Sequence, residues 1–132
     1  MFLGFDPGKD KCGVAVMGSD RYVHYHQVVS SVEVLTTINS LCQKYSIDVV
    51  IMGNQTTSKI WEKQLIDVLP NGVKIVKVNE RYSSLEARDR YWQMYPPKGL
   101  SLLIPQGMRV PPRPVDDIVA IVLIERWLMA NQ

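Results

Sequence analysis

Four acidic residues stand at the ends of segments that are far apart in the chain. Asp6 closes the first apolar run, Glu80 closes the last one, and Asp116 and Asp117 begin the final helical pattern. Ligands of sheets with parallel strands bind beyond the carboxyl ends of those strands, so we expect Asp6, Glu80 and one of the two aspartates to converge there. Carboxylate oxygens suit Mg²⁺ or Mn²⁺, and such cations promote attack of water on phosphodiesters. The residues therefore predict metal-dependent phosphodiester hydrolysis.

Each acid also has a simpler interpretation. Asp6 lies in an Asp-Pro-Gly sequence, which is ordinary turn chemistry, and Glu80 can pair with the neighbouring Arg81 or Lys77. Acidic residues in the first turn of a helix are favoured by its macrodipole. Taken one at a time these signals are weak, and the metal site is favoured by their distribution over three element ends.

The elements that must position these acids follow from hydrophobic periodicity. Short apolar runs rich in β-forming residues come first, and helical spacing then alternates with buried strands. An S-x-x-E capping box of Ser83 and Glu86 predicts the start of one helix, and a proline-rich loop separates it from the last helix. The predicted ranges are strands 1–6, 12–17, 22–29, 48–54 and 73–80, helices 32–45, 60–69, 83–95 and 116–130, and a loop over 96–115.

This order of elements predicts an α/β fold within one domain, residues 1–132. Three strands joined by short connections should be antiparallel. The two later strands alternate with helices and should be parallel. We therefore expect a mixed five-stranded sheet flanked by helices.

The composition is that of an ordinary globular protein, with 46% hydrophobic and 21% charged residues. A net charge of +2 does not identify a polyanion partner, but basic residues outnumber acidic ones between Lys77 and Arg113. Cys12 and Cys42 lack metal-ligand spacing and are interpreted as reduced thiols. No targeting segment and no apolar run of about 20 residues is seen, so we expect a cytoplasmic protein with no membrane span.

Four segments in a fixed order resemble the YqgF/RuvX-like family over about residues 2–128: GFDPGKDKCGVAV, DVVIMGN, NERYSSLEAR and VDDIVAIVLIERWL. This family has an RNase H-like fold and is related to the Holliday-junction resolvase RuvC. Asp6 matches the family's D-x-G pattern, Glu80 its D-E-R motif and Asp116 its D-x-x-A-A motif. The resemblance implies nuclease chemistry at these three residues with Mg²⁺ or Mn²⁺, and precursor ribosomal RNA or branched DNA as substrate.

The sequence departs from the family pattern at three places. Asn79 stands where the family has the Asp of D-E-R, and we expect an indirect effect rather than loss of metal. Asp117 offers an alternative register, because its spacing to Ala120 also fits D-x-x-A. Adjacent helical residues point about 100° apart, so one of the pair should face the metal; we favour Asp116 and keep Asp117 as the alternative ligand. Segment 93–114 does not match the family's short linker and is a candidate determinant of substrate choice.

Further residues are predicted to contact the phosphate backbone of the substrate. They comprise a turn glycine and the basic residues near the acidic motifs, and two arginines of the proline-rich loop. The candidates are Gly8, Lys9, Lys11, Arg81, Arg109 and Arg113.

Other residues are given structural interpretations. His24 and His26 alternate on a strand with no third ligand nearby, and Trp61, Trp92 and Trp127 follow apolar helical stripes. A non-catalytic nucleic-acid-binding or ribosome-associated factor remains the alternative function. The sequence leaves open whether the substrate is RNA or DNA, and whether the protein is a monomer or a homodimer.

Overall fold

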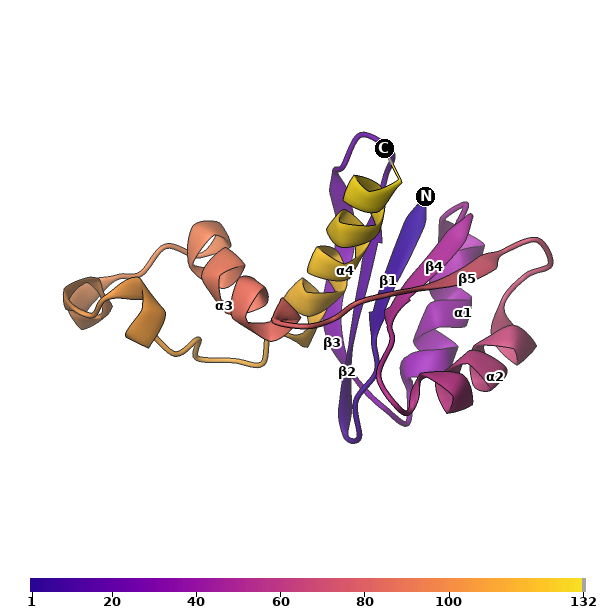
Figure 1. The fold of residues 1–132 in the computed structure, drawn as a ribbon, viewed down its shortest axis with the longest axis horizontal. Coiled ribbons are helices and arrows are strands. Elements are labelled where there is room, and N and C mark those ends of the chain that lie inside the picture. Colours follow the sequence, from indigo (N-terminus) through magenta and orange to yellow (C-terminus); the bar gives the residue numbers. More distant parts are fainter. Residues whose placement is uncertain (132) are drawn as a thin grey trace.

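The computed structural model describes residues 1–131 and contains the predicted five-stranded sheet (Figure 1). The strand order is β3-β2-β1-β4-β5. β1 pairs antiparallel with β2, and β2 pairs antiparallel with β3, whereas β1, β4 and β5 are parallel. The predicted mixed sheet is therefore confirmed. The strands are β1 Phe2–Asp6, β2 Lys11–Met17, β3 Val23–Ser30, β4 Val49–Gly53 and β5 Lys74–Val78.

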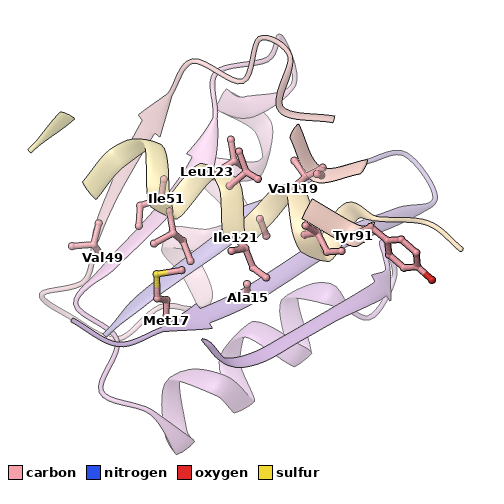
Figure 2. Packing of buried hydrophobic residues seen from close by; sticks show 13 residues of the cluster. Ala15, Met17, Val49, Ile51, Tyr91, Val119, Ile121 and Leu123 are labelled. Atoms are coloured by element: carbon pink, nitrogen blue, oxygen red, sulfur yellow. The ribbon is translucent and has the colours of Figure 1, made fainter. Parts of the chain in front are cut away.

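Four α-helices cover the sheet on both sides. α4 lies across one face, where it packs on Ala15, Met17 and Ile51, and α3 packs beside it (Figure 2). α1 and α2 cover the other face through residues such as Ile38 and Leu65. The alternation of side chains along β2 explains both layers, because successive strand residues point to opposite faces. The helices are α1 Val34–Lys44, α2 Ser58–Val68, α3 Ser83–Met94 and α4 Asp116–Ala130.

Two glycines of the sheet allow α4 to approach β1 and β2 closely. A Cβ atom added at Gly4 would lie 2.3 Å from the carbonyl oxygen of Ala120, and one added at Gly13 would lie 1.7 Å from that of Asp116. Larger residues would therefore push the helix away. The Asp116 end of α4 packs directly on the sheet, so close packing at these glycines also fixes the position of Asp116.

The proline-rich segment 96–115, called the arm below, extends away from the sheet (Figure 1). It contains two short 3-10 turns, η1 Gly99–Leu103 and η2 Gln106–Met108. This agrees with the prediction of a loop that holds at most short structure. The Nε of Arg109 donates a hydrogen bond to the carbonyl of Ser101 (3.0 Å), which ties the two turns together.

The predicted capping box of α3 is wrong. Tyr82 occupies the N-cap position with φ of 62°, and it makes no side-chain capping bond. Ser83 is the first helical residue and is buried. The carboxylate of Glu86 instead pairs with Arg126 of α4 (2.5 Å). The Glu86 carboxylate is thus engaged by α4, whereas in a capping box it would accept a hydrogen bond from the backbone N–H of the N-cap residue.

Two further predictions concern the cysteines and membrane-spanning helices. Both cysteines are free thiols; Cys12 is buried and Cys42 is half-buried. Within residues 1–131, no helix combines the length and apolar character that a membrane span requires.

Candidate active site

The register of the sheet brings three of the predicted acids to one edge. Asp6 is the last residue of β1 and lies opposite Gly13 of β2, where the backbone of Asp116 rests. On the other side of β1, β4 ends at Gly53, and a Cβ added there would lie 2.5 Å from Oε2 of Glu80. Asp6, Glu80 and Asp116 thus occupy the carboxyl edge of the parallel strands, as the sequence predicts.

The charges of these acids act on one another. Burial, followed by the negative charges of Asp116 and Glu80, raises the pKa of Asp6 from 3.8 to about 7. Burial also raises the pKa of Glu80 and of Asp116 above their ordinary values; for Asp116 the charge of Asp117 adds to this rise and Lys11 opposes it. Buried groups with such shifts in a cluster are typical of functional sites.

Within residues 1–131, no cationic side chain forms an ion pair with the cluster. Asp6, Glu80 and Asp116 take part in none of the ion pairs there. The simpler interpretation of Glu80 predicted pairing with Lys77 or Arg81. In the structure, Lys77 pairs with Glu62 (3.5 Å) and Arg81 lies over the ring of Tyr82 (4.9 Å to its centroid). The charge of Lys11 acts on Asp116, but the cluster has no ion-pair partner within this part of the chain.

This donor set fits a hard divalent cation by its chemistry. Mg²⁺ and Mn²⁺ prefer carboxylate oxygens, and positive charge would relieve the repulsion that raises the pKa of Asp6. In the described residues, however, no three His, Cys, Asp or Glu side chains form a ready-made metal cage. The carboxylates are thus close enough for their charges to repel one another, but they do not form a closed ligand shell.

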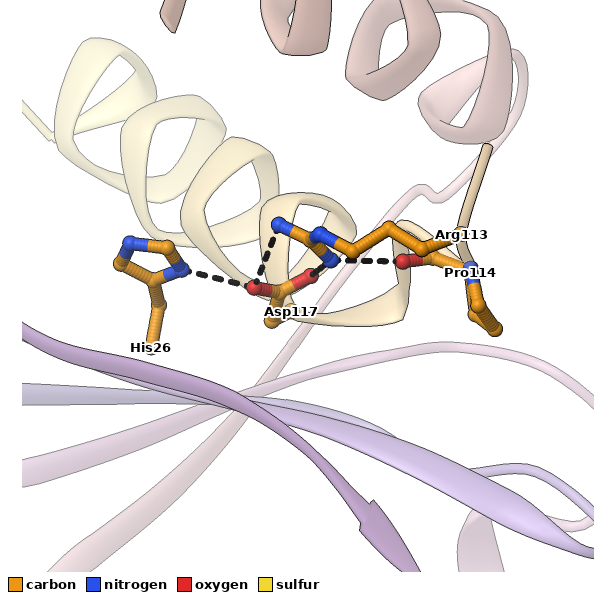
Figure 3. Close-up of polar contacts among 4 residues, drawn as sticks. All are labelled: His26, Arg113, Pro114 and Asp117. Carbon is orange, nitrogen blue, oxygen red and sulfur yellow. Dashed lines mark hydrogen bonds and ion pairs between the residues drawn. The ribbon is translucent and has the colours of Figure 1, made fainter. Parts of the chain in front are cut away.

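Asp117 is held by two side chains that do not belong to the cluster (Figure 3). His26 Nδ1 lies 2.6 Å from its Oδ2, and Arg113 Nη1 donates to its Oδ1 at 3.0 Å. Burial raises the pKa of Asp117, but hydrogen bonds from Arg113 and His26 outweigh burial and leave the pKa below its ordinary value. Asp116 and Asp117 therefore diverge as adjacent helical residues should, and Asp116 is the one whose charge reaches Asp6.

Neutralising these neighbouring aspartates should have opposite effects on stability. Asp117→Asn leaves Arg113 without its buried counter-charge, so we expect it to lower the free energy of unfolding by about 2 kcal/mol. Asp116→Asn removes a repulsive charge and should leave that free energy unchanged or raise it. Chemical denaturation of both variants in metal-free buffer at neutral pH measures the difference. If Asp116→Asn lowered the free energy of unfolding more than Asp117→Asn does, Asp116 rather than Asp117 would be the aspartate that stabilises the fold.

The predicted phosphate-binding residues are spread over three places. Lys11 is exposed beside Asp116, and Lys9 is exposed in the same hairpin. Gly8 is required by that hairpin, because a Cβ there would lie 2.2 Å from the carbonyl of Lys11. Arg113 pairs with Asp117 at the start of α4.

The remaining two predicted arginines have other contacts. Arg81 directly follows Glu80, and its guanidinium stacks on Tyr82. Arg109 belongs to the arm, where it contacts Ser101 and lies over Trp92, 6.0 Å from the ring centroid. The structure therefore places Lys11 beside the acid cluster and Arg113 on the neighbouring Asp117, whereas the contacts of Arg109 involve none of the acids.

Two positioning residues escaped the sequence analysis. His26 contacts Asp117, which lies 91 residues further along the chain. In the sequence, the alternation along its strand was the only sign of which face of the sheet His26 occupies. Arg126 donates to the carbonyl of Asn79 (2.7 Å) and also pairs with Glu86, so it fixes the segment that carries Glu80. The side chain of Asn79 accepts a hydrogen bond from the backbone N–H of Arg81 (2.9 Å) and so supplies an acceptor to the turn.

The sheet order and the helices on both faces define an RNase H-like fold. Among solved structures, the chain is similar to Thermus thermophilus RuvC in complex with a Holliday junction substrate, with a TM-score of 0.51 and 13% identity. A second structure of Thermus thermophilus RuvC gives a TM-score of 0.50 and 12% identity. Each match covers 92% of this chain and 88% of the other. At this identity the similarity establishes the shared fold.

No protein-family model matches the chain, and neither does any curated protein. The resemblance to YqgF/RuvX-like proteins therefore stays a prediction.

Proposed function

We propose that this protein is a nuclease that hydrolyses phosphodiester bonds in structured nucleic acid with the help of Mg²⁺ or Mn²⁺. The observation that carries the proposal is the convergence of Asp6, Glu80 and Asp116, none of which forms an ion pair within residues 1–131. The RuvC-like fold supports it, because the RuvC chain it resembles is bound to a Holliday junction. Branched DNA and precursor ribosomal RNA are the proposed substrates, as for YqgF/RuvX-like proteins.

In this proposal the three carboxylates are the ligands of the cation. When bound, it would supply positive charge to the phosphodiester and lower the pKa of a water molecule. The chain itself orients the reacting groups. Lys11 places a positive charge beside Asp116, where it can hold a phosphate oxygen. Asp117, anchored by His26 and Arg113, keeps the first turn of α4 in place and so directs Asp116 toward Asp6.

Cleavage of a mixed substrate panel tests the proposal. The panel contains a four-way DNA junction, single-stranded RNA and a ribosomal-precursor fragment, each with and without Mg²⁺ or Mn²⁺. Glu80→Gln should reduce cleavage by roughly 100-fold or more, because it removes charge that acts on the reacting phosphate. Glu62→Gln is the matched control, since Glu62 makes only a surface ion pair with Lys77.

A second candidate function is a non-catalytic nucleic-acid-binding or ribosome-associated factor. The absence of a ready-made metal cage in the described residues favours it. Tight binding of the panel without cleavage, unaffected by metal and by Glu80→Gln, would support this function and contradict the nuclease. The same experiment separates DNA from RNA as the preferred substrate.

A further inference from the structure

A groove of about 550 Å³ runs along the outer edge of the sheet, beside the acid cluster. One wall consists of the consecutive residues 27–30 of β3, which is an edge strand. Successive strand residues point to opposite faces, so a groove lined by all four follows the edge itself. Tyr95, Arg113 and Pro114 form the opposite wall, where the arm leaves α3 and returns to α4. We call this feature the β3 groove.

The β3 groove adjoins the candidate active site at Lys11. Lys11 lines the groove, and its charge also acts on the carboxylate of Asp116. Asp117, which follows Asp116 in the chain, lines the groove together with His26 and Arg113. Figure 3 shows the contacts among these three side chains. Because both of these partners contact Asp117, its charge does not repel an anion that enters the groove.

The lining of the β3 groove combines the groups that a nucleotide requires. The side chain of Tyr95 is 42% exposed, and the Arg113 guanidinium lies 5.7 Å from its ring centroid. Exposed aromatic rings beside arginine bind nucleobases by stacking, whatever the sequence. Gln27 and Ser30 add exposed hydrogen-bonding groups, and Lys11 adds a positive charge at the end nearest the acids, next to the exposed Asp10.

The size of the groove restricts what can enter it. Its volume is within the range of about 300–1,000 Å³ that small-ligand sites have. Such a volume holds one or two nucleotides and excludes the full width of a double helix. An extended peptide could pair with an edge strand, but the positive and aromatic groups here suit a base and its phosphate.

We propose that the β3 groove binds an unpaired stretch of the substrate strand next to the scissile phosphate, with a base stacked on Tyr95 and a phosphate near Lys11. This inference rests on the proposed function and deepens it, because it names single-stranded nucleic acid as the chemical class in the groove. Substrates with unpaired nucleotides beside the cleavage position should therefore bind better than continuous duplexes.

Binding of a fluorescent oligothymidylate of roughly ten nucleotides tests the stacking contact. Anisotropy is measured in metal-free buffer with a chelator, so that the result does not depend on cleavage. Tyr95→Ala should weaken binding roughly tenfold, and Tyr95→Phe should bind like the wild type. Tyr22→Ala is the matched control, because Tyr22 is 63% exposed but precedes the opposite end of β3. Equal binding by Tyr95→Ala and the wild type would overturn the proposal.

The ring of Tyr95 also contacts Tyr91, so its removal can affect the fold. A second pair of variants therefore leaves Tyr95 unchanged. Gln27→Glu adds a negative charge at an exposed position of the groove wall, and it should weaken oligothymidylate binding several-fold and more strongly at low salt. Gln43→Glu makes the same change on an exposed residue of α1. Equal effects of the two variants would show that the strand does not enter the groove.

Photo-crosslinking locates the bound strand directly. An oligothymidylate carrying 5-iodouracil should crosslink to Tyr95, as mapped by mass spectrometry of the digested protein. Crosslinks confined to Tyr22 or Tyr82 would overturn the proposal. If no substrate is cleaved but binding follows the pattern above, the nuclease proposal fails and the β3 groove stands. If cleavage requires Glu80 while Tyr95→Ala binds normally, the groove proposal alone fails.

Discussion

Asp6→Asn is expected to abolish metal-dependent cleavage and, in metal-free buffer above pH 7, to raise the free energy of unfolding. Burial and the charges of Asp116 and Glu80 disfavour the ionised form of Asp6 in the folded protein. Asparagine has nearly the same shape and carries no charge. The substitution should therefore relieve a destabilising repulsion while removing a proposed metal ligand, a combination that is typical of functional residues.

The pKa of Asp6 sets the pH range of this effect. Its value is 3.8 in the unfolded chain and about 7 in the folded one, so the folded protein binds the proton more tightly. The contribution of Asp6 to stability is then full below about pH 4, falls as the pH rises to about 7, and stays low above it. The upper limit of the loss is about 4 kcal/mol, because each pKa unit corresponds to about 1.4 kcal/mol. Asp6→Asn should lack this decline.

Denaturant unfolding at pH 5 and at pH 8 measures the effect. Asp10→Asn, at an exposed acid of the same hairpin, serves as the control. Added Mg²⁺ should stabilise the wild type, because a ligand that binds the folded state raises its stability, and it should not stabilise Asp6→Asn. A variant that is less stable than the wild type at pH 8 would identify Asp6 as a structural turn residue.

Gly13→Ala is expected to lower the free energy of unfolding by about 3 kcal/mol or more. Alanine is a better strand residue than glycine, so local preference alone would favour it. The new Cβ would, however, lie 1.7 Å from the carbonyl oxygen and 2.1 Å from the carbonyl carbon of Asp116. These are backbone atoms, which cannot rotate away as a side chain can. The N-terminus of α4 must therefore move, and overpacking of this kind is destabilising.

The same displacement should separate Asp116 from Asp6 and weaken any binding of Mg²⁺. Thermal unfolding and a titration with Mg²⁺ measure the two effects in one preparation. Gly107→Ala is the control, because a Cβ at Gly107 would meet no atom within 4 Å. Wild-type stability of Gly13→Ala would mean that α4 does not rest on β2 in solution.

Much of the fold could be predicted from local signals. The apolar run 48–54 lacks polar alternation, and in the structure β4 is buried over its whole length in the middle of the parallel strands. The short hairpin around Gly8 required antiparallel neighbours, which β1 and β2 are. The position of Glu80 just after a strand was enough to place it at the carboxyl edge. These predictions needed only periodicity and turn chemistry.

The contacts that orient the acids could not be predicted in the same way. Whether Asp117 faces the metal or the protein depends on His26, which comes from a strand 91 residues away. The capping box failed for a similar reason, since Arg126 of α4 offers Glu86 a stronger partner than the backbone of its own helix. Such choices are decided by tertiary contacts between distant residues, and a local pattern carries no information about them.

The position of α4 also has a consequence for the order in which the protein is made. α4 follows every strand of the sheet, yet it packs on β1 and β2, which are translated before the other strands. Chains emerge from the ribosome N-terminus first, so Ala15 and Met17 stay uncovered until α4 has been synthesised. Asp6 and Asp116 can meet only after that point. Nascent or prematurely terminated chains therefore lack the acid cluster, and they also expose an apolar sheet face that makes them substrates for chaperones and proteases.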